Sequence, residues 1–243
     1  MPTVKHVAVL NDVHGNLPAL EAVLAELDDE PVDAVVCGGD VLWGAYQAEC
    51  IALLRDRGAR FLTGNCERSV LLGADDQMAW CGLQLSPDQR AFVGSWPGTV
   101  QLDVDGLGRV LLCHGSPRSD EEILTVATPD ETAAEAIAGI DADLVVIGHT
   151  HHQFDRRVEG TRLVNAGSVG LPYEGRAGAY WALLGPDVEL RRTEYDVAAA
   201  ADRLRASGMP GIDDLLPESL LEPVPRDEVV AHFERQAGRG ESS

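Results

Sequence analysis

The chain has 243 residues, of which 45% are hydrophobic, and a formal net charge of −21. We expect one domain spanning residues 1–243, because this length and composition can bury one sizeable core. The charge argues against a nucleic-acid polymer as substrate, since phosphate contacts need a basic patch. No apolar stretch approaches the roughly 18 residues of a membrane-spanning helix, and the five cysteines are irregularly spaced. These features predict a cytoplasmic protein with reduced thiols and no membrane partner.

The first part of the chain is expected to alternate strands and helices. Short apolar runs at 7–10, 34–37 and 61–63 are typical of strands covered on both faces. A helix should follow the first run, with Asn16 as its N-cap, and a second helix is expected at about 47–57. This order predicts a parallel sheet with right-handed crossovers.

The middle of the chain is less regular. Residues 73–97 show no clear hydrophobic period, apart from a helix start at Ser86-Pro87-Asp88. Further elements are expected as strands at 99–104 and 109–113, a helix at 129–140 and a buried strand at 144–147. The stretches 162–165, 179–184 and 188–195 are expected to form an antiparallel second sheet.

The C-terminal part begins with a helix that Asp196 should cap and that should end near Gly208. Residues 209–226 are rich in proline, so we expect an extended connection there. A short amphipathic helix should follow, and we expect the tail at 238–243 to be disordered.

Metal-ligand residues follow five of the apolar runs. They are Asp12, His14, Asp40, Asn65, His114, His149 and His151. Strands buried on both faces carry ligands just beyond their carboxyl ends, so we expect these side chains to converge at one edge. Oxygen and nitrogen ligands suit Mn²⁺, Fe²⁺, Zn²⁺, Ni²⁺ or Co²⁺, and we take Mn²⁺ as the first ion to test. Two ions explain seven ligands better than one, and a hydroxide between them could attack a phosphoryl group.

Five motifs, in this order, resemble those of the calcineurin-like metallophosphoesterases, in particular the small bacterial phosphodiesterases. They are Asn11-Asp12-Val13-His14-Gly15-Asn16, Gly38-Gly39-Asp40, Gly64-Asn65-Cys66-Glu67, Cys113-His114-Gly115 and Gly148-His149-Thr150-His151. The resemblance covers roughly residues 4–184 and implies an α/β fold, a two-sheet α/β/β/α sandwich. The ligands that it implies are Asp12, His14 and His151 for one ion, Asn65, His114 and His149 for the other, and Asp40 for both.

The sequence therefore predicts a dinuclear metal-dependent hydrolase that cleaves small phosphodiesters by attack of a metal-bridging hydroxide. Asp40, Asn65 and His114 are the predicted catalytic residues. One alternative is a phosphomonoesterase acting on a protein or a nucleotide, and another is a non-catalytic scaffold or regulatory protein on the same fold. The sequence leaves open the natural substrate, the physiological metal and whether the chain forms a homo-oligomer.

One motif position departs from the family pattern. Many family members carry a histidine, the proposed acid for the leaving group, where this chain has Cys66. His152 is an alternative proton donor, or else a surface residue. Arg68 and Arg118 lie near motif loops and could bind a substrate phosphate, and Trp43 could form an aromatic wall. Each of these three is equally compatible with a surface or packing role.

Overall fold

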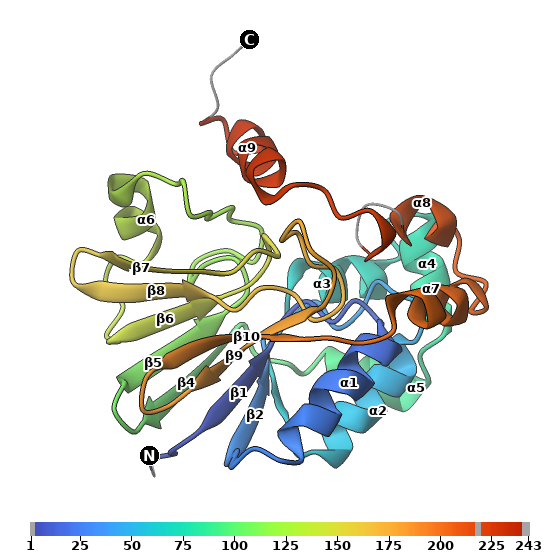
Figure 1. Ribbon diagram of the computed structural model, residues 1–243, viewed down its shortest axis with the longest axis horizontal. Coiled ribbons are helices and arrows are strands. Elements are labelled where there is room, and N and C mark those ends of the chain that lie inside the picture. The colour runs from blue at the N-terminus through green and yellow to red at the C-terminus, as the bar shows by residue number, and fades with distance from the viewer. Residues whose placement is uncertain (1–2, 217–219, 240–243) are drawn as a thin grey trace.

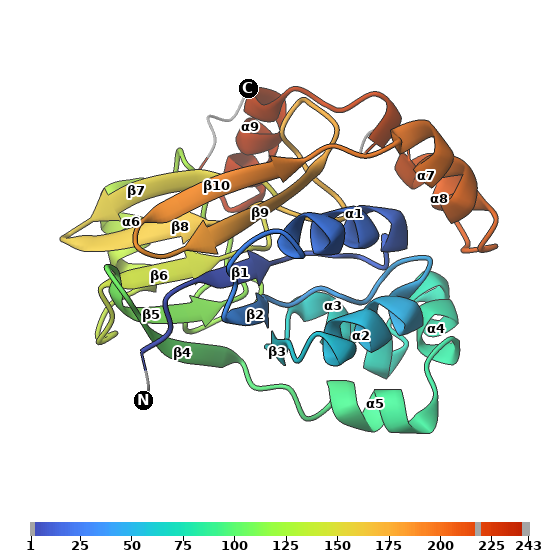
Figure 2. The same cartoon turned by 60° about the horizontal axis from the view of Figure 1, so that its bottom comes forward.

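The computed structural model describes residues 3–216 and 220–239. Two five-stranded sheets pack face to face, with helices on their outer sides, as Figures 1 and 2 show. This is the expected α/β architecture, a two-sheet α/β/β/α sandwich. No helix among the described residues is both long and apolar enough to cross a membrane.

The first sheet has the strand order β10-β9-β1-β2-β3. Its strands are β1 (Val7–Leu10), β2 (Ala34–Cys37), β3 (Arg60–Phe61), β9 (Ala179–Leu184) and β10 (Val188–Thr193). β1, β2 and β3 are parallel, as the βαβαβ pattern predicts. β9 runs antiparallel to β1, with Ala8 opposite Leu183.

The second sheet has the strand order β4-β5-β6-β8-β7. Its strands are β4 (Thr99–Val104), β5 (Gly108–Cys113), β6 (Leu144–Ile147), β7 (Phe154–Val158) and β8 (Thr161–Asn165). The expectation that 162–165, 179–184 and 188–195 share an antiparallel second sheet is wrong. β8 lies parallel to β6, whereas β9 and β10 extend the first sheet. Every residue of β9 is buried, and such a strand fits either sheet by its local pattern.

The helices are α1 (Leu17–Leu27), α2 (Gln47–Asp56), α3 (Asn65–Leu72), α4 (Asp76–Leu83), α5 (Pro87–Val93), α6 (Asp130–Ala136), α7 (Val197–Arg205), α8 (Ile212–Leu216) and α9 (Arg226–Gln236). The Asn16 side chain caps α1 by accepting a hydrogen bond from the backbone of Ala19. α3 and α4 were not expected from the sequence. α8 lies inside the predicted extended connection at 209–226, of which residues 217–219 are outside the described chain.

Strand alternation builds the layers. Val7 and Val9 of β1 pack between the two sheets, whereas Ala8 and Leu10 face α1 and α2. In the second sheet Leu112 points to the inter-sheet core, and Leu111 points to the outer core under α6. The two sheets are thus held by one shared apolar layer, which fixes the relative position of the loops at their edges.

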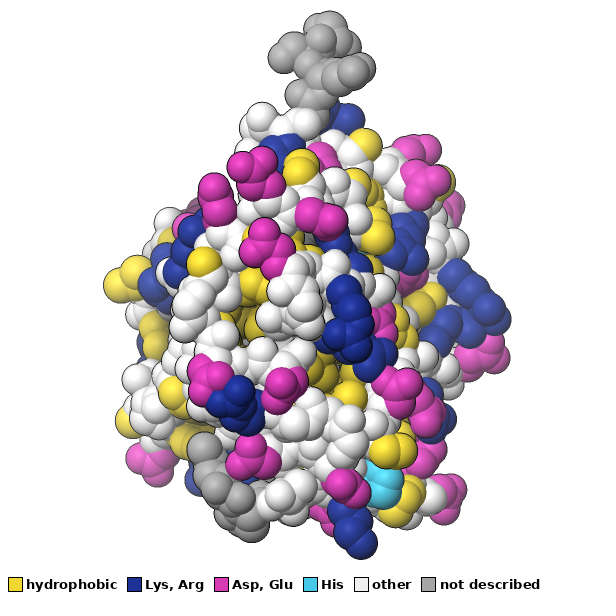
Figure 3. All heavy atoms as spheres, turned by 90° about the vertical axis from the view of Figure 1, so that its left-hand side faces the viewer, with side chains coloured by type: hydrophobic (Ala, Val, Ile, Leu, Met, Phe, Trp, Pro, Cys, Tyr) yellow, Lys and Arg dark blue, Asp and Glu magenta, His cyan; other side chains and the backbone are white. Residues whose placement is uncertain are grey.

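The face formed by β7 and α6 carries charges of both signs. Figure 3 views the side on which β7 and α6 lie in Figure 1, and basic and acidic side chains are interspersed there. Arg156 of β7 pairs with Asp130, and Arg162 of β8 pairs with Asp155.

Candidate metal centre

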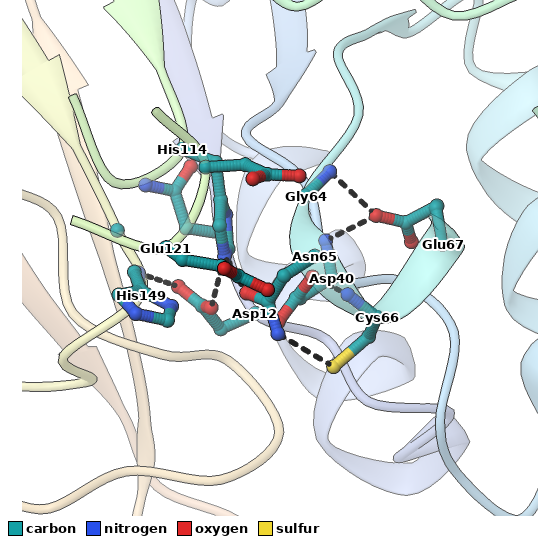
Figure 4. Close-up of polar contacts among 12 residues, drawn as sticks. Asp12, Asp40, Gly64, Asn65, Cys66, Glu67, His114, Glu121 and His149 are labelled. Atoms are coloured by element: carbon teal, nitrogen blue, oxygen red, sulfur yellow. Dashed lines mark hydrogen bonds and ion pairs between the residues drawn. The ribbon is translucent and has the colours of Figure 1, made fainter. Parts of the chain in front are cut away.

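All seven predicted ligands lie just beyond the carboxyl ends of strands and meet at the junction between the two sheets. Asp12 and His14 follow β1, Asp40 follows β2, and Asn65 begins α3 directly after β3 and its loop. The second sheet supplies His114 after β5 and the pair His149 and His151 after β6. Figure 4 shows these loops bringing carboxylate, amide and imidazole groups together. The predicted convergence is therefore present in the structure.

The backbone at this cluster is strained. Asp12, His14, Asp40, His149 and His151 all have positive φ, between 45° and 65°. Only two other non-glycine residues of the described chain share this conformation, Trp43 and Glu159. A left-handed conformation disfavours residues with a Cβ and persists only where the surroundings hold it. Such strain concentrates at functional sites.

The imidazoles are oriented by the backbone. The Nδ1 atoms of His14, His114 and His151 lie 3.2, 3.0 and 2.7 Å from the carbonyl oxygens of Leu42, Gly38 and Leu171. A carbonyl oxygen only accepts, so each Nδ1 carries the proton and donates it. Each Nε2 atom therefore faces the cluster. Metal-binding histidines are held in this way by outer hydrogen bonds.

The Nε2 atoms surround two carboxylates. Asp12 Oδ1 lies 3.2 Å from Nε2 of His151 and 3.9 Å from Nε2 of His114. Asp40 Oδ2 lies 3.3 Å from Nε2 of His114 and 4.0 Å from Nε2 of His14. Asp12 Oδ1 also lies 4.0 Å from Nε2 of His14, so each carboxylate lies within 4.0 Å of a histidine from each sheet.

These atoms form groups that could hold divalent ions. One group contains Asp12, His14 and His151, another contains Asp40, His114 and His149, and within each group the potential ligand atoms lie within 4.8 Å of one another. Asp40 also groups with His14 and Cys66, so its carboxylate is shared. The amide oxygen of Asn65 lies 3.1 Å from Nε2 of His114.

One buried atom supports the fit to a cation. Asp12 Oδ1 is buried and has no hydrogen-bond partner. A buried carboxylate oxygen without a donor carries a large desolvation cost, which a bound cation would offset. The donor set and this orphaned oxygen fit a divalent ion of the borderline class.

Burial and charge set the protonation of the cluster. Burial lowers the pKa of His14 and of His149 to about 4, so both imidazoles are neutral and can act as ligands. Burial also disfavours the charged form of His114, but the adjacent Asp40 carboxylate outweighs it and raises the pKa to about 10. Burial, and then Asp40, raise the pKa of the Cys66 thiol well above its usual value. Cys66 is therefore a neutral thiol and not a thiolate nucleophile.

Glu67 is the last residue of the third motif. The sequence alone predicts no role for it, but the structure gives it one. Its buried carboxylate accepts hydrogen bonds from the backbone N–H groups of Gly64, Asp40, Val41 and Leu42 at 2.7–3.0 Å. Figure 4 shows Glu67 bonded to Gly64 on the side away from the histidines. Glu67 thus fixes the turn that carries Asp40. The only sign of this role in the sequence is the position of Glu67, three residues after Gly64.

The predicted substrate-binding residues lie around the cluster. Arg68 forms ion pairs with Asp120 and Glu121, and Arg118 forms one with Glu122. Both guanidinium groups are about half exposed. The ring of Trp43 stands edge-on to His14, with centroids 5.3 Å apart.

A cavity of about 330 Å³ opens beside His114. Its lining includes Thr63, Thr99, Ser116 and Arg118. This cavity borders His114 of the cluster, and its lining includes Arg118, one of the predicted substrate-binding residues.

His152 is a buried residue and not a surface one. Its Nδ1 lies 2.9 Å from the carbonyl oxygen of Thr150, and its Nε2 lies 3.4 Å from the backbone N–H of Val126. Both ring nitrogens are engaged by the backbone. Burial lowers the pKa of His152 to about 4, so this imidazole is neutral. His152 is therefore a structural residue and a poor proton donor.

The fold and the cluster define a class of protein: a two-sheet sandwich with carboxylate and imidazole groups, able to bind metals, at the junction of its sheets. The chain belongs to the calcineurin-like phosphoesterase superfamily, whose family model matches residues 6–185. The resemblance found in the five motifs is thus confirmed.

Related proteins cover most of the chain. A metallophosphoesterase of Sphaerobacter thermophilus is 26% identical, with a TM-score of 0.73 over 90% of this chain and 100% of that one. A hypothetical protein of Pyrococcus horikoshii has a TM-score of 0.77 at 20% identity, over 90% and 99% of the two chains. An uncharacterized protein of Methanocaldococcus jannaschii is 27% identical over 84% of this chain and 93% of its own length.

Proposed function

We propose that the chain is a dinuclear metal-dependent phosphoesterase that prefers small phosphodiesters. The observation that carries this proposal is the convergence of seven potential ligands, five of them on left-handed backbone. Six of them fall into groups of donor atoms, two of which share Asp40, and the amide oxygen of Asn65 lies beside His114. The implied assignment places Asp12, His14 and His151 at one ion, Asn65, His114 and His149 at the other, and Asp40 at both.

The residues have distinct roles in this proposal. Two bound divalent ions would supply activation of water and stabilisation of phosphoryl charge near neutral pH. His14 and His149 are held neutral by burial, and backbone carbonyls aim Nε2 of His14, His114 and His151. Glu67 holds the turn of Asp40 through backbone N–H groups. The site thus arrives preorganised, which lowers the cost of binding both ions.

Charge supports a diester over a monoester. A diester carries one negative charge, whereas a monoester carries up to two near neutral pH. The chain has a net charge of −21, and its nearby guanidinium groups, Arg68 and Arg118, already pair with carboxylates. Repulsion should therefore disfavour the dianion more strongly.

The leaving group should need little proton donation. Cys66 is a buried neutral thiol, and both ring nitrogens of His152 are occupied. Neither side chain is suited to the part of general acid. We therefore expect esters with stable leaving groups, such as aryl oxides, to react fastest.

We take Mn²⁺ as the first ion to test and the cytoplasm as the compartment. The five cysteines are free and buried, which suits a reducing environment. The test is hydrolysis of bis-p-nitrophenyl phosphate and p-nitrophenyl phosphate after chelation and return of Mn²⁺. Asp40→Asn and His114→Ala should abolish turnover, and His6→Ala, at a histidine outside the cluster, should not.

Two results would separate the proposal from its alternatives, and a third checks the specificity of the variants. Faster turnover of the monoester would favour a phosphomonoesterase. Loss of turnover in His6→Ala would indicate that the effect of His114→Ala is not specific to the cluster. A folded parent protein that neither binds Mn²⁺ nor cleaves either ester would favour a scaffold or regulatory role on the same fold.

A further inference from the structure

The C-terminal helix α9 lies outside residues 6–185 that match the family, yet it is tied to the metal centre. Figure 1 shows α9 apart from the helices that cover the first sheet. Its Glu234 is buried and accepts hydrogen bonds from the hydroxyls of Thr125 and Thr128, at 2.7 and 2.8 Å. Arg239 also donates to Glu234, at 2.7 Å, and to the carbonyl oxygen of Ile123. Residues 238 and 239, expected to begin a disordered tail, are therefore held, while 240–243 lie outside the described chain.

The segment that Glu234 holds supports the loop between two predicted ligands. Thr150, between His149 and His151, donates its hydroxyl to the carbonyl oxygen of Leu124 at 3.1 Å. One residue after His151, the ring of His152 accepts the backbone N–H of Val126. Residues 123–128 thus link Glu234 to both sides of His151.

Two further contacts join α9 to the same loop. Tyr173 stacks on His151, with ring centroids 5.0 Å apart, and its backbone N–H donates to the carbonyl oxygen of His151 at 3.0 Å. Phe233 of α9 lies 6.2 Å from the Tyr173 ring. Arg226, the first residue of α9, donates to the carbonyl oxygen of Gln153. Both ends of α9 therefore contact the His149–Gln153 region or a residue packed on it.

The loop needs such support because both of its predicted ligands are strained. His149 and His151 have φ values of 65° and 56°. Strained backbone relaxes when the contacts that enforce it are removed, and the ligand atoms then move away from the position that binds metal.

We propose that α9 is a positioning element for the metal centre, in which Glu234 acts through residues 123–128 to hold His149 and His151 in their ligand geometry. This inference rests on the proposed function, because it takes these histidines as metal ligands. Glu234 is a positioning residue: its hydrogen bonds come from Thr125, Thr128 and Arg239 and not from the predicted ligands.

The test measures Mn²⁺ affinity of the full chain by calorimetry, independently of turnover. Glu234→Gln and Thr125→Val should each weaken Mn²⁺ binding by about tenfold, the lower end of what outer hydrogen-bond partners of metal ligands contribute. Thr125→Ser keeps the hydroxyl and should restore an affinity close to the parent's. Glu228→Gln, the same chemical change at an exposed position of α9, should leave it unchanged. Excess Mn²⁺ should recover turnover in the weakened variants.

Parent-like Mn²⁺ affinity in folded Glu234→Gln and Thr125→Val would overturn the inference while leaving the proposed function intact. A lower melting temperature without a change of affinity would do the same, because it would show a merely structural role. Equal weakening in Glu228→Gln would also overturn it. If Glu234→Gln does not fold, the comparison of Thr125→Val with Thr125→Ser decides. A parent protein that binds no Mn²⁺ would overturn the proposed function and the inference together.

Discussion

Backbone strain at His149 predicts an unusual order of stabilities. His149→Gly should be more stable than His149→Ala in the metal-free protein, because the residue has a φ of 65°. The left-handed conformation of a residue with a Cβ lowers the free energy of unfolding by about 1–2 kcal/mol. Glycine lowers it by about 0.4–1 kcal/mol, because it makes the unfolded chain more flexible. The difference between these two contributions makes His149→Gly more stable than His149→Ala by on the order of 1 kcal/mol.

The assay is urea or thermal unfolding with a chelator present, so that loss of the imidazole affects both variants equally. A difference of about 1 kcal/mol corresponds to about 2–4 °C in melting temperature for a chain of this size. The matched control is Glu49, exposed within α2, where the alanine variant should exceed the glycine variant by about 1 kcal/mol. If His149→Ala proved as stable as His149→Gly, the reasoning from strain would be refuted.

Three other outcomes are expected. Mn²⁺ at about 1,000 times its dissociation constant should stabilise the parent by about 4 kcal/mol per site, raising its melting temperature by on the order of 10 °C; no shift in the parent, or an equal shift in Asp40→Asn, would contradict this. Burial disfavours the charged form of Glu234, but hydrogen bonds from Arg239 and from threonine hydroxyls outweigh it and lower the pKa from 4.5 to about 2. The stability advantage of the parent over Glu234→Gln should therefore be complete above about pH 4.5 and disappear as the pH falls towards 2, and an advantage independent of pH in urea titrations would exclude this origin. Gly44→Ala should destabilise the protein by more than about 2 kcal/mol, because an added Cβ would lie 1.7 Å from the carbonyl oxygen of His14; Gly98→Ala, with open space around it, is the control, and equal unfolding midpoints would show that the turn yields.

The chemistry of the site was more predictable than its supports. Apolar runs that end in ligand residues identify the converging strands, because the pattern and the ligands are both local in sequence. Glu67 and Glu234 depend instead on hydrogen bonds to segments that lie 25–27 and 106–109 residues away. The hydrophobic periodicity of the sequence does not predict such long-range hydrogen-bond partners. The ion pairs of Arg68 and Arg118 were equally difficult to predict. Their acidic partners lie in a loop whose conformation the hydrophobic pattern does not define.

The membership of the strands in the two sheets was the main error about the fold. The run Ala179–Leu184 is buried throughout, so its pattern indicates cover on both faces but not which strand it pairs with. In the structure Trp181 packs under the helices of the first sheet, while Ala182 points to the layer between the sheets. Pairing with β1 across more than 170 residues is a tertiary choice, which local propensity cannot express.

The division of the seven converging side chains between two sheets also bears on how the protein assembles and fails. β1, β2 and β3 carry Asp12, His14, Asp40 and Asn65 to the junction, and β5 and β6 carry the three remaining histidines. Neither sheet carries all seven side chains, so the cluster forms only when the two sheets pack together across their shared apolar layer. A probe that senses the cluster would therefore report the docking of the two sheets, and would lose its signal when they part, even while each sheet kept its own hydrogen bonds.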